Sequence, residues 1–244
     1  MKTKMKVLLL LVMMAIGITF TSCDSDDPSN AAVIDMKMKA KTSANNVAGR
    51  SAVENVTFNE VLLGVSELEL ETIQEDELEE LEGEDEEEEV EFEGRFVVDL
   101  LNGTSTPDFG VSSIVPGVYD EIELELSPIV EDQYSVFVSF SYMDANNETI
   151  NVEYSNANEL EFEIEDDNGF VLEAGVTHQM LVVLDLDLLF SSIDLSNASV
   201  DNDGVIRINA QSNAAIASQI DNALYEVFEA GEDTDDDGDL EDED

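Results

Sequence analysis

The sequence predicts an all-β protein: an antiparallel β-sandwich of the immunoglobulin-like or prealbumin-like kind, with one C-terminal helix and disordered acidic segments. Apolar and polar residues alternate in about seven short runs, as in strands with one buried and one solvated face. Turn sequences separate the runs, and no strand–helix rhythm indicates a parallel α/β sheet. The hydrophobic fraction of 43% is high enough for a packed core.

Residues 1–22 have the features of a secretory signal peptide. Three early lysines precede the apolar run 7–18, which is shorter than the roughly 20 residues of a membrane-spanning helix. The sequence Phe-Thr-Ser-Cys at 20–23 follows and resembles the lipobox of bacterial lipoproteins, with Phe20 where leucine is usual. The resemblance implies that Cys23, the only cysteine, is lipidated and anchors the protein to a membrane. The alternative is an ordinary secretory peptide.

An acidic cluster, Asp-Ser-Asp-Asp at 24–27, comes directly after this cysteine. It resembles the surface-export signal of Bacteroidota lipoproteins, which implies a lipid-anchored protein at the cell surface, on the outer face of the outer membrane. The periplasmic face is the alternative location. Residues 23–50 are poor in large apolar side chains, and we interpret them as a flexible tether.

The charge balance excludes one class of partner. The chain has 59 acidic and 9 basic residues, a formal charge of −50, and cleavage before Cys23 would remove three lysines and change it to −53. Nucleic-acid binding needs lysine and arginine for phosphate contacts, so no nucleic acid is expected as a partner. Such a charge also destabilises the compact state unless cations screen it, and both salt adaptation and divalent-cation binding would explain it.

The predicted sandwich domain spans residues 51–210. In chain order, its alternating runs are 56–71, 90–100, 121–126, 134–142, 150–154, 160–164 and 180–188. Turn sequences rich in Gly, Asn and Asp lie at 102–103, 116–117, 144–147, 167–169 and 202–204. Residues 74–93 carry 14 acids in 20 positions and are predicted to form a disordered acidic loop between two strands.

In the C-terminal part, the apolar residues no longer alternate as in a strand but recur at helical spacing. Ile216, Ile220 and Leu224 have this spacing, which predicts an amphipathic helix over 211–230 that packs on the sandwich. Asn213 is the expected N-cap and Gly231 the expected stop. An acidic tail, 231–244, completes the chain.

Four stretches together resemble the β-sandwich domain of an uncharacterised family of bacterial surface lipoproteins. They are residues 96–103, 115–122, 184–187 and 203–208. The resemblance covers roughly residues 56–210. It implies the fold and the location only, because no activity comes with it.

The acidic tail contains the best candidate for a metal site. Asp233, Asp235, Asp237 and Gly238 match positions 1, 3, 5 and 6 of an EF-hand loop, although Asp244 replaces the usual glutamate at position 12. Oxygen ligands at alternating positions suit calcium. The predicted calcium ligands are Asp233, Asp235, Asp237, Asp239, Glu241 and Asp244. The competing interpretation is a solvated acidic tail.

Catalytic patterns are weak, and we expect no enzyme. His178 is the only histidine, which excludes multi-histidine metal sites and makes a structural role the simplest interpretation. No nucleophile elbow, P-loop or dinucleotide-binding glycine pattern is present. The carboxylates at 185 and 187, and at 201 and 203, are interpreted as a solvated strand face and a turn. The expected function is a non-enzymatic binding or adhesion module that calcium assists, with an unknown protein or glycan as partner. The alternatives are a glycan-capture subunit of a polysaccharide-uptake system and a carboxylate-based hydrolase.

Overall fold

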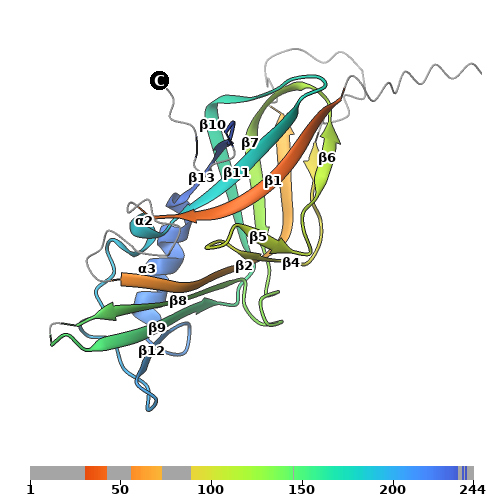
Figure 1. Ribbon diagram of the computed structural model, residues 1–244. Helices are drawn as coiled ribbons and strands as arrows, with labels where there is room; N and C mark the ends of the chain where they lie inside the picture. Colours follow the sequence, from red (N-terminus) through yellow and green to blue (C-terminus); the bar gives the residue numbers. More distant parts are fainter. Residues whose placement is uncertain are drawn as a thin grey trace, which may run out of the picture.

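The computed structural model describes residues 31–42, 56–72, 89–144, 146–235, 238 and 240, apart from the side chains of 167 and 168. Two β-sheets and a small helical part make up these residues, which confirms the all-β sandwich (Figure 1). The signal peptide 1–22, Cys23 and residues 74–88 of the acidic loop lie outside the described residues, so those predictions stay predictions. No helix in the described ranges is long and apolar enough to cross a membrane.

The strands are β1 (Ala32–Lys41), β2 (Val56–Thr72), β3 (Val90–Glu91), β4 (Phe96–Asp99), β5 (Thr104–Thr106), β6 (Val111–Ile114), β7 (Gly117–Leu126), β8 (Val136–Met143), β9 (Thr149–Asn156), β10 (Leu160–Leu172), β11 (Thr177–Asp185), β12 (Val205–Ile208) and β13 (Phe228–Glu232). The helices are α2 (Leu186–Phe190), α3 (Ala214–Ala223) and the 3-10 helix η1 (Leu224–Glu226).

The large sheet follows the order β10-β7-β2-β8-β9-β12, with β3 and β4 also paired to β2. Strand β2 is 17 residues long, so residues 56–63 can pair with β8 and residues 65–72 with β7. Gly64 lies between these two pairings, where a Cβ atom would overlap the carbonyl oxygen of Ser127. The lack of a side chain therefore lets both partners approach one strand.

The small sheet has the order β13-β11-β1-β6 and contains one of two parallel pairings. Strand β1 runs parallel to β11, and β12 runs parallel to β9, whereas the other pairings are antiparallel. The predicted antiparallel sandwich is therefore confirmed apart from these two parallel pairings. The alternation within a strand reports which face is buried, but it carries no information about the direction of the neighbouring strand.

Strand β1 corrects the prediction of a flexible tether for residues 32–41, whereas residues 23–30 and 43–50 of that range lie outside the described residues. It lies between β11 and β6, and its side chains of Ile34, Met36 and Met38 are buried in the core. The polar side chains between them, among them Lys37 and Lys39, are only partly buried, so the strand has the two-residue period of a half-buried element.

Two further elements differ from the prediction. The run 180–188 ends as a strand at Asp185, because the Asp185 side chain accepts a hydrogen bond from the Leu188 N–H at 2.8 Å and caps helix α2. The helix predicted over 211–230 is shorter: α3 and η1 end at Glu226, and β13 follows and pairs with β11. Residues 231 and 232 of the predicted acidic tail belong to this strand.

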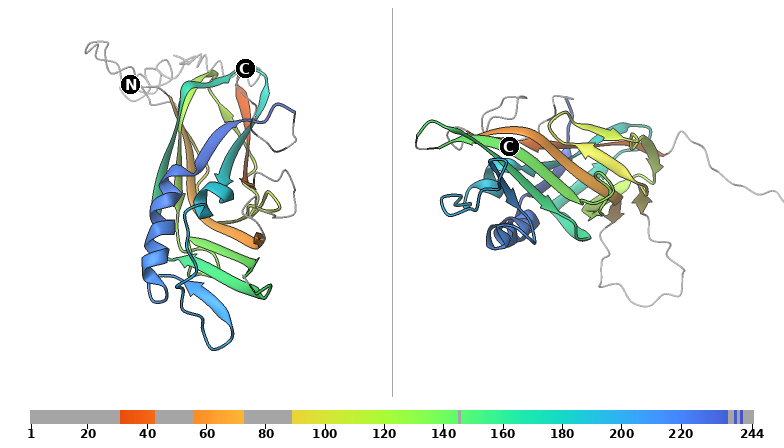
Figure 2. Two further views of the ribbon diagram at one scale, coloured as in Figure 1. Left: turned by 90° about the vertical axis from the view of Figure 1, so that its left-hand side faces the viewer. Right: turned by 90° about the horizontal axis from the view of Figure 1, so that it is seen from below.

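The inner face of the large sheet is covered in two ways. The small sheet lies over the β10-β7-β2 part, whereas α2, α3 and the connecting segment 191–204 lie over the β2-β8-β9-β12 part (Figures 1 and 2). Side chains of both parts belong to one continuous hydrophobic core. The second cover is largely irregular chain, and the candidate site lies beneath it.

Candidate ligand-binding site

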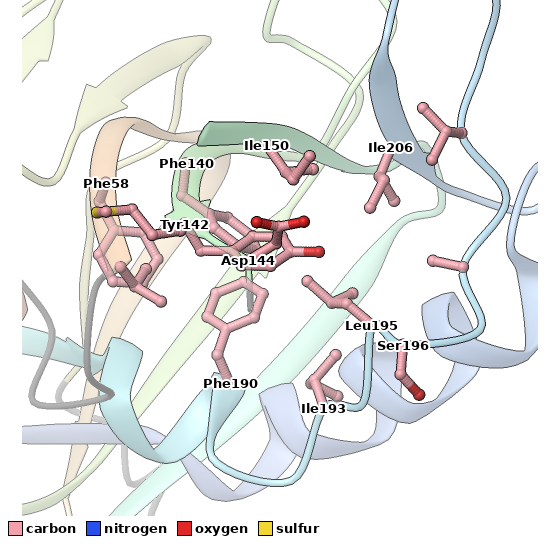
Figure 3. A pocket seen from close by; sticks show the side chains of 14 residues that line it. Phe58, Phe140, Tyr142, Asp144, Ile150, Phe190, Ile193, Leu195, Ser196 and Ile206 are labelled. Carbon is pink, nitrogen blue, oxygen red and sulfur yellow. The ribbon is translucent and has the colours of Figure 1, made fainter. Parts of the chain in front are cut away.

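A cavity of about 630 Å³ opens between the inner face of the large sheet and the chain from 190 to 200 (Figure 3). Strands β2, β8, β9 and β12 supply one wall, and the end of α2 with the segment after it supplies the other. The lining residues are Val56, Phe58, Phe140, Tyr142, Met143, Asp144, Ile150, Phe190, Ile193, Leu195, Ser196, Ala198, Val200 and Ile206. Cavities of about 300–1,000 Å³ with mostly apolar walls and few polar groups are typical of small-molecule sites.

Three buried aromatic rings form one part of the lining. Phe58, Phe140 and Phe190 contact one another, with ring centroids 5.1 to 5.6 Å apart. All three belong to the buried core, and they come from β2, β8 and the end of α2. Tilted ring pairs at this separation stabilise each other, so this part of the cavity has a fixed apolar wall.

The polar groups of the lining come mainly from the end of β8. The side chains of Tyr142 and Asp144 are partly buried, and in the view of Figure 3 their oxygen atoms lie between Ile150, Phe190 and Leu195. Burial raises the pKa of Tyr142, and the charge of Asp144 raises it further. Met143 and Val200 are 46% and 55% exposed, which places them at the rim.

Asn213 holds the irregular cover in place. Its side chain accepts a hydrogen bond from the Ser199 N–H at 2.7 Å and donates to the carbonyl oxygens of Ser199 and Arg207 at 3.0 and 2.7 Å. Asn213 stands at the N-cap position of α3, as predicted, but its side chain makes no cap hydrogen bond and its φ is +53°. The residue instead clamps the 191–204 segment to strand β12.

The outer face of the large sheet carries an array of ten glutamates, which we call the glutamate face. Its members are Glu67, Glu69, Glu71, Glu91, Glu121, Glu123, Glu125, Glu161, Glu163 and Glu165. In register, Glu163 is opposite Glu123, which is opposite Glu69, and Glu69 is also opposite Glu91. Like charges directly opposite each other destabilise a sheet, and these four strands contain no lysine or arginine.

This crowding perturbs the carboxyl groups. Burial, a hydrogen bond with Glu89 and the charges of neighbouring glutamates together raise the pKa of Glu69 to about 7. The pKa values of Glu67, Glu121 and Glu123 are raised as well, first by burial and then by neighbouring carboxylates. Sets of three carboxylates approach within 4.8 Å, such as Glu69, Glu71 and Glu123. Exposed acids gather in this way without a metal ion, so the array by itself defines no metal site.

The predicted calcium loop is described only in part. Asp233 and Gly238 come together, because the Gly238 N–H donates to an Asp233 carboxylate oxygen at 2.9 Å. Lys37 and Lys39 line the same hollow of about 200 Å³, and the Lys39 ammonium donates to the Gly238 carbonyl at 3.4 Å. Asp235 is described, but the remaining predicted ligands lie outside the described residues: Asp237, Asp239, Glu241 and Asp244. Calcium binding there stays a prediction.

The other polar candidates have structural partners. Asp201 and Asp203 flank a turn, as predicted, and their carboxylates bind the Arg207 guanidinium, each at 2.8 Å. Buried His178 accepts a hydrogen bond at Nε2 from the Glu173 N–H at 2.9 Å, so its Nδ1–H donates to Glu232 at 2.8 Å. Both ring nitrogens are therefore used within the fold.

The cavity was not predicted from the sequence. Phe58, Phe140 and Tyr142 fit ordinary strand patterns, and the wall from 190 to 200 has no period of its own. A turn-rich segment that carries Ile193, Leu195 and Val200 is the one signal that could have indicated an apolar cover. No protein-family model, curated protein or solved structure matches this chain, so these residues and their geometry carry the functional argument.

Proposed function

We propose that this protein is a lipid-anchored envelope protein, displayed at the cell surface, that binds an apolar small molecule in the cavity beneath the 191–204 segment. The cavity carries the binding part of this proposal, because its volume of about 630 Å³ and its aliphatic and aromatic lining suit such a ligand. The lipobox-like sequence that ends at Cys23 supports the anchoring part.

The cavity supports binding better than the alternatives. Asp144 is the only carboxylate among its lining residues, whereas glycoside hydrolysis commonly uses two carboxyl groups. Glycan capture would be favoured by several exposed aromatic side chains, and within the described ranges Tyr225, at 59% exposure, is the one large aromatic residue of that kind. Calcium, if the tail binds it, would act at a hollow that shares no lining residue with the cavity.

A neutral fluorescent probe tests the binding. Residues 24–244 should bind N-phenyl-1-naphthylamine saturably, at about one molecule per chain. Ala198→Phe would fill part of the cavity and should weaken binding at least tenfold. Ala210→Phe is the matched control, because Ala210 is exposed and outside the lining. Binding that is absent from the wild type, or unchanged in a folded A198F variant, would refute the proposal.

The anchoring part has its own test. A full-length chain expressed in a bacterium that exports lipoproteins should incorporate labelled palmitate and partition with the membrane. Cys23→Ala should abolish both the label and the partitioning. Protease added to intact cells should remove the protein if it is displayed on the outer face and spare it if it faces the periplasm.

A further inference from the structure

We infer that the natural ligand of the cavity is a cationic amphiphile, an apolar chain that ends in an amine or ammonium group, with the cation beside Asp144. This inference rests on the proposed function and specifies its ligand class. It depends on how the Asp144 carboxylate is held, on the lack of lysine and arginine among the described lining residues, and on the change from polar groups at the end of β8 to buried aromatic rings.

The Asp144 carboxylate is fixed in place by its own turn. One oxygen accepts hydrogen bonds from the N–H groups of Asn146 and Glu148, both at 2.8 Å, and the other accepts from the Asn146 side-chain amide at 3.0 Å. These donors, the Glu148 N–H above all, hold the pKa of Asp144 below its usual value. The cavity therefore presents a permanent negative charge in a preorganised position.

Within the part of the chain that the structure describes, no cation in the cavity lining balances this charge. The lining residues include neither lysine nor arginine. Arg207 follows the lining residue Ile206, but successive side chains of a strand point to opposite faces, and its guanidinium binds Glu153, Asp201 and Asp203. A ligand that brings its own positive charge would supply the missing partner, whereas an anionic head group would be repelled.

Tyr142 completes the polar part of the lining. Its hydroxyl group has no hydrogen-bond partner among the described residues, and a raised pKa keeps it protonated. A neutral phenol can accept a hydrogen bond from an ammonium group. Phe58, Phe140 and Phe190 are at most 9% exposed, so the chain of the ligand would extend from the polar groups at the end of β8 toward these rings.

Matched ten-carbon ligands test the head-group preference. Decylamine, decanol and decanoate would each compete with N-phenyl-1-naphthylamine at pH 7 and 0.5 M NaCl, below their critical micelle concentrations. At this salt the Debye length is about 4 Å, so the general charge of the protein is largely screened. We expect decylamine to compete best and decanoate to be at least tenfold weaker.

The Asp144→Asn variant distinguishes the effect of this carboxylate on ligand preference from the effect of the net charge of the protein. The variant keeps a side-chain acceptor for the turn, and it should bring the three ligands within about threefold of one another. Asp108→Asn is the control, because Asp108 accepts a similar hydrogen bond, from the Gly110 N–H at 2.8 Å, and lies outside the cavity lining. This variant should keep the wild-type preference.

The outcomes distinguish the two proposals. Equal competition by all three ligands in the wild type would overturn the cationic ligand and leave the binding cavity standing. A preference that survives Asp144→Asn, or disappears equally in Asp108→Asn, would also overturn it. If the neutral probe itself does not bind, the proposed function fails first.

Discussion

A few polar side chains attach helix α3, which covers part of the inner face, to the large sheet. The Tyr154 hydroxyl donates to an Asp221 carboxylate oxygen at 2.5 Å, and the Asn156 amide donates to the same oxygen at 2.9 Å. Burial and the Asp221 carboxylate raise the pKa of Tyr154 far above its usual value. This network joins α3 to β9 inside the protein, where an unpaired donor is costly.

Removing the Asp221 carboxylate, which accepts both hydrogen bonds, should destabilise the fold. We expect Asp221→Ala to lower the free energy of unfolding by about 1–3 kcal/mol, because two buried donors lose their partner. Asp221→Asn keeps an acceptor oxygen and should cost less. Urea unfolding at pH 7 would measure both variants. An alanine variant as stable as the wild type would show that the network does not stabilise the fold.

The predicted calcium loop makes a second prediction at the scale of single residues. Because Lys37 and Lys39 line the hollow beside Asp233, we expect calcium to bind weakly, with a Kd of about 10⁻⁴–10⁻³ M. Lys39→Gln removes a like charge and should tighten binding severalfold. Calorimetric titration in high NaCl would measure this effect. A chain that ends at Asp235 keeps β13 intact and should lose the site. If neither the wild type nor the Lys39→Gln variant binds calcium saturably, the acidic tail is not a calcium site.

Among the secondary-structure elements, we expect deletion of β1 to reduce the stability of the fold most. A chain that begins at residue 43 would lose the strand between β11 and β6 and its four buried side chains, Ala32, Ile34, Met36 and Met38. We expect this chain to lack a cooperative thermal transition, whereas a chain that begins at residue 24 should unfold cooperatively. Circular dichroism would compare them, and a peptide of residues 31–42 should restore the transition. A stable truncated chain would mean that β1 is dispensable.

The cover over the cavity depends on Asn213. Asn213→Gly keeps the residue free to adopt φ of +53° but removes the amide that binds Ser199 and Arg207. We expect faster amide hydrogen exchange over 191–204 and severalfold weaker binding of N-phenyl-1-naphthylamine. Asn222→Gly, at the exposed side chain that bonds the Ser218 carbonyl, tests for a general loss of helix stability. Equal exchange in the wild type and N213G would show that the clamp is unnecessary.

Individual strands and helices differ in how well the sequence predicts them. Strong alternation, as in Leu160 to Ile164, correctly predicted β10, because each apolar residue faces the core. The same alternation is present in β1, but lysines and methionines carry it, which is why the sequence predicts a tether there. The change from strand to helix at Asp185 depends on a side-chain cap. The cavity depends on where an irregular segment crosses a sheet, and no local period encodes that path.

The whole molecule separates its charge from its binding site. The glutamate face lies outside, on strands β10, β7, β2 and β3, while the cavity lies on the inner side of the same large sheet. The sequence shows that glutamates alternate with apolar residues along each strand. Only the strand register shows that glutamates from separate strands are direct neighbours. Their mutual repulsion acts on the stability of the whole fold.

This repulsion predicts an unusual pH dependence of stability. A raised pKa means that the folded protein holds protons more tightly than the unfolded chain, so folding is favoured as pH falls. For Glu69, the gain is complete below its ordinary pKa of 4.5 and is lost as pH rises through about 7. Glu67, Glu121 and Glu123 shift in the same direction. We therefore expect the thermal midpoint to rise as pH is lowered from 8 to 5.

Two single substitutions would test whether the glutamate face is the source of this effect. Glu69→Gln removes the carboxyl group with the most strongly raised pKa of the array and should flatten the dependence between pH 5 and 8. Glu60→Gln changes the same charge at an exposed position of β2 outside the array and should leave the slope unchanged. Scanning calorimetry at constant ionic strength would compare them. A midpoint that falls as pH is lowered from 8 to 5 in the wild type would contradict the argument, because carboxylates that stabilise the fold in their charged form would then dominate.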